Sequence, residues 1–356
     1  MTYELRQRLE EGPIEASVPC RVDMGGTLDL AIFYNPLRHQ LPCTFNAAIN
    51  LRTKIRLLPY RTGIVKISSR GFQDAEYPAS RAPFNHPLGL MFAVAAYFNA
   101  DGVHIDIDSA SPPRSALGGS SAAAVALVAA LLVARQKTPL TAGTRRKIAL
   151  LAHAIEESVA SVPCGRQDQL AAAFGGVNAW HWRQDLNGPG FKRKALFRTQ
   201  YLPKFERHLL VAYGGVPHES KNINGRWVQQ FISGQQRDRW QEILQCTKMF
   251  IDAVIRKNYK DAAAAMNSET AHRRKMTPEV LDAMGEKLID KAVENNCGAR
   301  FTGAGGGGCI WALGTIDDID RLRPLWVRVL AKRRQAHLLE AAIDSDGLLL
   351  HSASFA

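Results

Sequence analysis

The stretch Ser111-Pro-Pro-Arg-Ser-Ala-Leu-Gly-Gly-Ser-Ser-Ala122 lies between a predicted strand, Val103–Asp108, and an alanine-rich run. Its prolines end the preceding strand, and its glycines let backbone N–H groups approach an anion closely. The alanine-rich run after Ser120 predicts a helix whose positive dipole end would face the same anion. Capping of that helix would by itself explain the serines. We favour a phosphate loop with a serine hydroxyl directed to Mg²⁺, formed by Ala116, Leu117, Gly118, Gly119, Ser120, Ser121 and Ala122.

A second glycine-rich stretch, Phe301-Thr-Gly-Ala-Gly-Gly-Gly-Gly-Cys309, lies almost two hundred residues further on. Because five glycines in six positions cost considerable folding entropy, the stretch predicts that its backbone closely approaches another group. Residues 303–308 also satisfy G-x-G-x-x-G, so a dinucleotide-dependent oxidoreductase is an alternative. The apolar run Cys309–Leu313 that follows favours a strand where that fingerprint requires a helix. Two such loops together predict a kinase-type site for a nucleotide's phosphates, although neither ends in Gly-Lys-Ser/Thr.

Length and composition indicate a globular protein with two lobes. The chain has 356 residues, of which 46% are hydrophobic, and its longest continuous apolar run, Ala122–Ala134, is too short to span a bilayer. We therefore expect no membrane association and, because the N-terminus resembles no secretory signal, a cytoplasmic location. The net charge of +12 is dispersed along the chain, which favours anionic small substrates over nucleic acid. A homo-oligomer is compatible with the sequence.

Hydrophobic periodicity places the two loops in an alternation of strands and helices. Strands are predicted at Ser17–Asp23, Ala48–Leu58, Val103–Asp108, Leu209–Tyr213 and Cys309–Leu313, with a turn into a strand at Phe174–Trp182. Helices are predicted at His86–Asn99, Ser120–Ala134, Thr144–Ser161 and Ile319–Arg334, and across most of Arg226–Asn296. The character of the chain changes near residue 205, so we expect one lobe at 1–205 and a second at 206–356.

The two glycine-rich stretches resemble the second and third motifs of the galactokinase, homoserine kinase, mevalonate kinase and phosphomevalonate kinase (GHMP) superfamily. Val18-Pro-Cys-Arg-Val-Asp-Met-Gly-Gly-Thr-Leu-Asp-Leu30 is similar to its first motif, which holds the substrate. The resemblance implies a two-lobed α+β fold, with a ribosomal-protein-like βαβ lobe followed by a ferredoxin-like lobe. It also implies ATP and Mg²⁺, with ATP and a sugar or sugar phosphate in the cleft between the lobes.

Gly165-Arg-Gln-Asp-Gln-Leu-Ala-Ala-Ala-Phe-Gly-Gly-Val-Asn178 closely resembles the catalytic segment of bacterial heptose 7-phosphate kinases. By this resemblance Asp168 faces the acceptor hydroxyl, Arg21 lies beside it, and Glu156 joins Ser120 or Ser121 as a metal ligand. Glu157 remains an alternative to Glu156. The substrate-binding residues that it implies are Gly25, Gly26, Thr27, Asp29, Gly165, Arg166, Gln167, Gly303, Ala304, Gly305 and Gly306.

Each of the three motifs departs from the superfamily's pattern. Leu28 separates Thr27 from Asp29, which leaves Asp29, or else Asp23, as the carboxylate that reaches the sugar. Ala116 and Gly119 occupy positions where relatives often have Gly and Ser. Arg300 replaces a common lysine and is compatible with a cation that faces the nucleotide. The resemblance implies phosphorylation of a heptose 7-phosphate at its anomeric hydroxyl, for nucleotide-heptose and capsule or lipopolysaccharide synthesis, or else of free fucose, galactose or mannose.

Overall fold

The first part of the chain forms a sheet with helices on one face. The computed structural model describes residues 2–135, 139–160, 163–183, 188–217 and 223–352. Within them the sheet has the order β12-β1-β2-β5-β3-β4, and β6 and β7 extend it beside β2. All pairs are antiparallel except β3 with β5. The strands are β1 (Ile14–Met24), β2 (Cys43–Pro59), β3 (Ile64–Ser69), β4 (Ala75–Pro78), β5 (Val103–Ser109), β6 (Val177–Trp182), β7 (Phe191–Ala195) and β12 (Leu349–Ser352).

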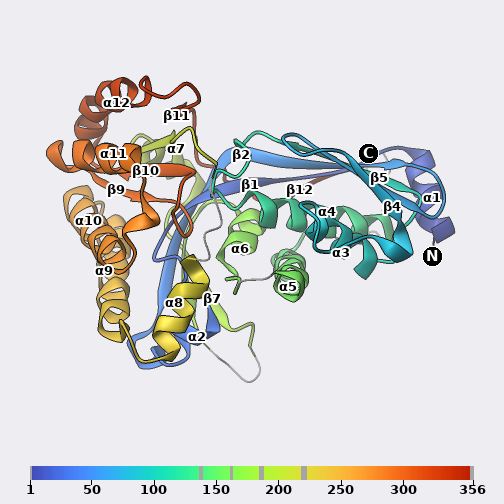
Figure 1. Cartoon of the computed structure of the whole chain (residues 1–356), viewed down its shortest axis with the longest axis horizontal. Coiled ribbons are helices and arrows are strands. Elements are labelled where there is room, and N and C mark those ends of the chain that lie inside the picture. Colours follow the sequence, from blue (N-terminus) through green and yellow to red (C-terminus); the bar gives the residue numbers. More distant parts are fainter. Residues whose placement is uncertain (1, 136–138, 161–162, 184–187, 218–222, 353–356) are drawn as a thin grey trace.

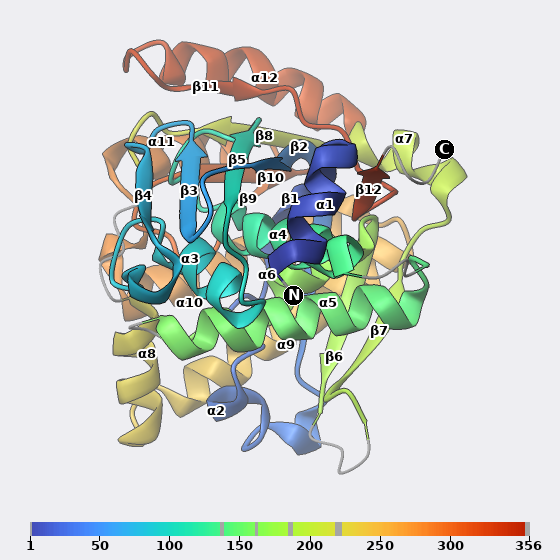
Figure 2. The same cartoon turned by 90° about the vertical axis from the view of Figure 1, so that its right-hand side faces the viewer.

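Helices α3 to α6 lie side by side beneath this sheet (Figure 1). The alanine-rich α4 is buried on every side from Ala122 to Ala130, because its small side chains let the sheet and the other helices approach closely. In the view of Figure 2, α5 lies along the outer side of this layer. The helices of the first part are α1 (Thr2–Glu11), α2 (Ala31–Tyr34), α3 (Gly89–Tyr97), α4 (Gly119–Arg135), α5 (Ala142–Val159), α6 (Gln167–Phe174) and α7 (Leu202–Glu206).

The later part of the chain forms a smaller antiparallel sheet of order β11-β8-β10-β9. Its strands are β8 (Leu209–Tyr213), β9 (Gly298–Phe301), β10 (Cys309–Leu313) and β11 (His337–Leu339). Its helices lie on the opposite side of the molecule from α1 (Figure 1). They are α8 (Ile223–Ile232), α9 (Arg237–Ile255), α10 (Tyr259–Met276), α11 (Ala283–Glu294) and α12 (Ile316–Leu330).

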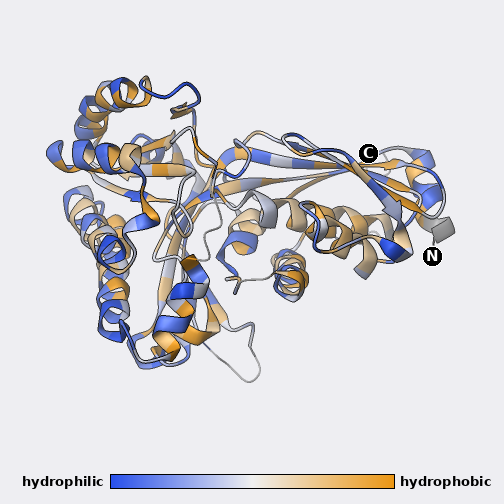
Figure 3. Ribbon diagram, in the orientation of Figure 1, coloured by the Kyte–Doolittle hydropathy of each residue, from blue (hydrophilic) through white to orange (hydrophobic). Residues whose placement is uncertain are grey.

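Two apolar cores hold these layers together, and strands β1 and β2 contribute to both. Val18 and Ile55 pack in the core beneath the first sheet, whereas Val22 and Phe45 pack in the core of the later part. The apolar residues are accordingly concentrated on the inward faces of the helices (Figure 3). Among the described residues, none of the helices combines the length and apolar character that a membrane crossing needs.

The α+β fold class predicted from the sequence is confirmed, and so are the strands Leu209–Tyr213 and Cys309–Leu313, to the residue. The predicted helix Thr144–Ser161 is confirmed as α5, although Ser161 lies outside the described residues. The sequence analysis missed β3, β4 and β7. It also missed β12, which follows the second half of the chain yet pairs with β1 in the first sheet. The lobe boundary near residue 205 remains a proposal.

Candidate active site

A cavity of about 420 Å³ opens where the two parts of the molecule meet. Most of its wall comes from the first part, including the loop of residues 111–116 and the first turn of α4. Asn224, Gly303 and Ala304 add a wall from the later part. The first turn of a helix leaves backbone N–H groups without intrahelical partners, so this wall is suited to an anion.

The predicted catalytic pair lies in this cavity. The guanidinium of Arg21, on β1, donates to both carboxylate oxygens of Asp168 over 2.8 Å, from Nε and from Nη2. Its third nitrogen donates to the carbonyl oxygen of Ala116 over 2.7 Å, which ties the pair to the phosphate loop. Asp168 stands in the first turn of α6, and its side chain is 22% exposed, whereas that of Arg21 is 5% exposed. Arg21 is therefore held on all sides, and Asp168 remains accessible.

Two predicted metal ligands, Ser121 and Glu156, lie next to each other. The Ser121 hydroxyl donates to Glu156 Oε1 over 3.1 Å, and the Gln169 amide donates to Oε2 over 2.7 Å. Among the described residues no lysine, arginine or histidine pairs with this carboxylate, and burial raises its pKa to about 7. A buried carboxylate without a cation is costly, so the site suits a metal ion. Ser120 also lines the cavity but is exposed, as is Glu157, which does not line it.

Asp29 lines the cavity close to the catalytic segment, whereas Asp23 does not line it. One oxygen of Asp29 accepts from the backbone N–H of Gln167 over 3.0 Å. Burial, chiefly, raises the pKa of Asp29 to about 6. Thr27 lies in the same turn, holds a left-handed backbone with φ 78°, and also lines the cavity. These positions favour Asp29 over Asp23 as the carboxylate that faces the acceptor.

The second glycine-rich stretch reaches the cavity only through Gly303 and Ala304. A Cβ at Gly305 would lie 2.5 Å from the carbonyl oxygen of Val280, and one at Gly308 would lie 2.5 Å from that of Ser115. The N–H of Gly306 donates to Val280 as well. The prediction of close backbone approach is therefore correct, but at these three glycines the approach is to the protein's own backbone. They pack the hairpin against its neighbours.

Arg300 does not face the nucleotide, which corrects the sequence analysis. Its side chain is fully buried and pairs with Asp23 and Glu269, and it does not line the cavity. Some other predicted site residues are also absent from the cavity wall. They are Gly25, Gly26, Leu117, Ala122, Arg166, Gly305 and Gly306. Gly25 and Gly26 belong to the turn that places Thr27, and Leu117 accepts from the N–H of Arg21 over 3.1 Å.

Replacing Gly165 by alanine is expected to displace Asp29. A Cβ at this position would lie 1.7 Å from Asp29 Oδ2, so the substitution should cost about 1–3 kcal/mol or more of folding free energy. Denaturant unfolding would measure the loss. Gly143→Ala is the matched control, because its Cβ would meet only Thr141 Oγ1 at 3.6 Å within a helix. Equal stabilities for the two variants would contradict the expectation.

The chain is similar to known kinases in sequence and in fold. Residues 85–176 match the model of the GHMP kinases N terminal domain. A mevalonate kinase of Thermococcus gammatolerans is 24% identical over 298 residues, which cover 75% of this chain and 81% of that protein. A crystal structure of a D-glycero-D-manno-heptose 1-phosphate kinase of Bacteroides thetaiotaomicron superposes with a TM-score of 0.71 at 18% identity, covering 95% of this chain and 99% of that one. The galactokinase of Lactococcus lactis complexed with galactose gives a TM-score of 0.71 at 17% identity, covering 98% of each chain.

The proteins that the chain resembles form a class, the ATP-dependent kinases that phosphorylate hydroxyl groups. Residues 85–176 match the N-terminal domain of the GHMP kinases, and the chain shares the two-lobed α+β fold of the solved structures. The alternative of a dinucleotide-dependent oxidoreductase is wrong. Residues 303–308 join two antiparallel strands, β9 and β10, and open no helix.

Proposed function

We propose that the chain transfers the γ-phosphoryl group of ATP to a sugar hydroxyl, with Asp168 and Arg21 as catalytic residues. The observation that carries this proposal is the contact between the catalytic pair and the phosphate loop. Arg21 joins Asp168 to Ala116, and a Cβ at Gly118 would lie 3.1 Å from Asp168 Oδ2. A carboxylate this close to the loop can meet an acceptor hydroxyl beside the terminal phosphate of a bound nucleotide.

The geometry supports a direct transfer. The acceptor oxygen would form a bond to the γ-phosphorus while the bond from that phosphorus to the β,γ-bridging oxygen breaks, and ADP leaves. Asp168 would orient the hydroxyl and take its proton. Arg21 occupies one lone pair on each carboxylate oxygen, which leaves others free for this task. Arg21 itself would hold Asp168 in position and stabilise charge that develops on the transferred group.

Ser121 and Glu156 are the residues that would hold Mg²⁺, with Gln169 orienting the carboxylate. When bound, the ion would neutralise charge on the nucleotide's phosphates. We propose the adenine position on the cavity wall that β3, α3 and β5 form. That wall is largely apolar, with Phe72, Leu88, Met91 and Ile107, and it carries Arg70 at its edge.

For the acceptor we propose a heptose 7-phosphate that is phosphorylated at its anomeric hydroxyl, in a path to capsule or lipopolysaccharide. The similarity of residues 165–178 to heptose 7-phosphate kinases supports this, and the fold shared with a heptose 1-phosphate kinase agrees with it. The polar side chains of Thr27, Asp29 and Asn224 in the cavity suit a polyhydroxylated ligand. The alternative is an unphosphorylated sugar such as fucose, galactose or mannose.

ADP release from Mg-ATP across a panel of acceptors tests the proposal. The panel contains heptose 7-phosphates, free heptose, mannose, fucose, galactose and, because of the matched relatives, mevalonate. Phosphorus NMR of the product would locate the new phosphate. We expect turnover with a heptose 7-phosphate that gives an anomeric phosphate. Turnover with a free sugar alone would assign the alternative, and turnover with mevalonate alone would overturn the sugar assignment.

A further inference from the structure

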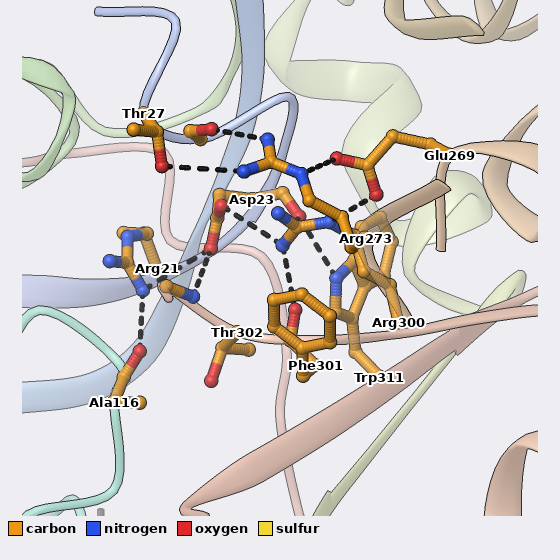
Figure 4. Close-up of polar contacts among 12 residues, drawn as sticks. Arg21, Asp23, Thr27, Ala116, Glu269, Arg273, Arg300, Phe301, Thr302 and Trp311 are labelled. Atoms are coloured by element: carbon orange, nitrogen blue, oxygen red, sulfur yellow. Dashed lines mark hydrogen bonds and ion pairs between the residues drawn. The ribbon is translucent and has the colours of Figure 1, made fainter. Parts of the chain in front are cut away.

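Six charged side chains form a chain of alternating sign that starts at Asp168 and runs into the later part of the molecule. Figure 4 shows five of them, from Arg21 to Arg273. We call it the buried ion chain, and its members in order are Asp168, Arg21, Asp23, Arg300, Glu269 and Arg273. The last four are 0% exposed. Three carboxylates balance three guanidinium groups, so the chain as a whole is neutral, which makes its burial tolerable.

Every link of the buried ion chain lies within ion-pair distance. Arg21 Nη1 lies 3.5 Å from Asp23 Oδ1, and Asp23 Oδ2 accepts from Arg300 Nη1 over 3.1 Å. Glu269, on α10, then joins two arginines, accepting from Arg300 Nε and from Arg273 Nε over 2.9 Å each. Burial alone would raise the pKa of Glu269, but the charges of Arg300 and then Arg273 outweigh burial and lower it. Glu269 is therefore ionised, and it links Arg300 to Arg273.

The far end of the buried ion chain returns to the cavity. Arg273 Nη2 donates to the carbonyl oxygen of Gly26 over 2.6 Å, and Nη1 lies 3.5 Å from Thr27 Oγ1. Thr27 lines the cavity in a left-handed backbone conformation, which persists only where its surroundings hold it. The faces of Trp227 and Trp240, 4.7 and 4.6 Å from the Arg273 guanidinium, fix that side chain in turn. One carboxylate, Glu269, is thus connected to both sides of the acceptor region.

Folding stability is a poor explanation for this arrangement. Replacing a buried ion network by apolar side chains of similar volume is often neutral or stabilising. Arg300 Nη2 is buried without a hydrogen-bond partner among the described residues, which adds a cost. The arrangement instead fixes the positions of two residues that line the cavity, Thr27 and Asp168, relative to each other.

We infer that Glu269 is a positioning residue for the acceptor. Through Arg273 it fixes the turn that carries Thr27, and through Arg300, Asp23 and Arg21 it fixes Asp168. This inference rests on the proposed function, in that Asp168 and Thr27 are taken to face the acceptor. Neither Glu269 nor its two arginines line the cavity, so the nucleotide is bound independently of them.

Two conservative variants test separately the connection through Arg273 to Thr27 and the connection through Arg300 to Asp168. Arg273→Lys keeps the charge but loses the planar fork that reaches Glu269, Gly26 and Thr27 together. We expect the acceptor KM to rise at least tenfold, with kcat within threefold of the wild type.

In Arg300→Lys, the single ammonium nitrogen of lysine replaces the two guanidinium nitrogens that bridge Glu269 and Asp23. We expect kcat to fall at least tenfold, with the acceptor KM within threefold. The KM for ATP should change less than twofold in both variants.

Arg52→Lys is the matched control for a purely structural loss. Arg52 pairs with Asp344 and donates to the backbone carbonyls of Ser17, on β1, and Gly347, just before β12, but it does not line the cavity. We expect a lower melting temperature and unchanged KM values. The same behaviour in Arg273→Lys and Arg300→Lys would overturn the inference.

A crystal structure of Glu269→Asp provides a test that needs no acceptor. This variant keeps the charge and therefore avoids the uncompensated buried arginines that Glu269→Gln would leave. We expect displacement of the Thr27 turn and of the Arg21–Asp168 pair. If both stay in place, the inference fails whatever the acceptor is, whereas failure of the acceptor panel alone would count against the proposed function.

Discussion

Replacing Asp168 by asparagine should lower kcat by about 10²–10⁴-fold while nucleotide binding survives. Asparagine cannot take the proton of the acceptor hydroxyl. In the wild type, the Arg21 guanidinium donates to both carboxylate oxygens of Asp168. Asparagine has only one acceptor oxygen, so its NH₂ group would face an N–H of Arg21. The main-chain groups of the phosphate loop are untouched, and the nucleotide should therefore still bind.

ADP release with the acceptor found in the panel measures the loss, and the rise in melting temperature with Mg-ATP measures binding. Asp317→Asn is a suitable control, because Asp317 is also a carboxylate in the first turn of a helix, α12, but is exposed and does not line the cavity. Its kcat should stay within twofold of the wild type. More than a few per cent of wild-type turnover in Asp168→Asn would remove Asp168 from the proton-transfer role.

Local signals predicted much of this site from the sequence. The Pro-Pro and Gly-Gly pairs at residues 112–119 indicated a loop before a helix, and α4 begins at Gly119. The periodic segments also gave the strand that carries Arg21 and the helix that carries Glu156, but not α6, which carries Asp168. Such predictions depend on neighbours within a few residues, which a sequence displays directly.

Contacts between distant residues could not be predicted in this way. The partner of Arg300 on β1, Asp23, is 277 residues away, so a cation beside a glycine-rich loop was interpreted as facing the nucleotide. Glu269 belongs to a helix whose charges resemble those of a solvated face, and nothing local distinguishes it from an exposed glutamate. The roles of Ser120 and Ser121 differ only in burial, since a helix of small residues gives no periodic signal to orient it.

Asp29→Asn is expected to make the protein more stable and less active. The asparagine oxygen can keep the hydrogen bond from Gln167 N–H, while the cost of burying a charge disappears. The pKa of Asp29 is about 6 in the folded protein, against an ordinary value of 3.8. Between these values the folded state binds more protons than the unfolded state, so the contribution of Asp29 to stability falls as pH rises from about 4 to about 6.

Above pH 6 the wild type bears the full cost of burying an ionised Asp29. A difference of about 2 pKa units corresponds to about 3 kcal/mol, by which the free energy of unfolding of Asp29→Asn should exceed that of the wild type. Below pH 4 the two proteins should be equally stable. Urea unfolding at pH 4, 6 and 8 would measure the difference, and kcat/KM for the acceptor at pH 8 should fall at least tenfold, because a carboxylate binds sugar hydroxyls more strongly than an amide. Loss of stability at every pH would instead identify Asp29 as structural. Gain of stability with loss of activity is the combination expected of a charge that is buried to bind a ligand.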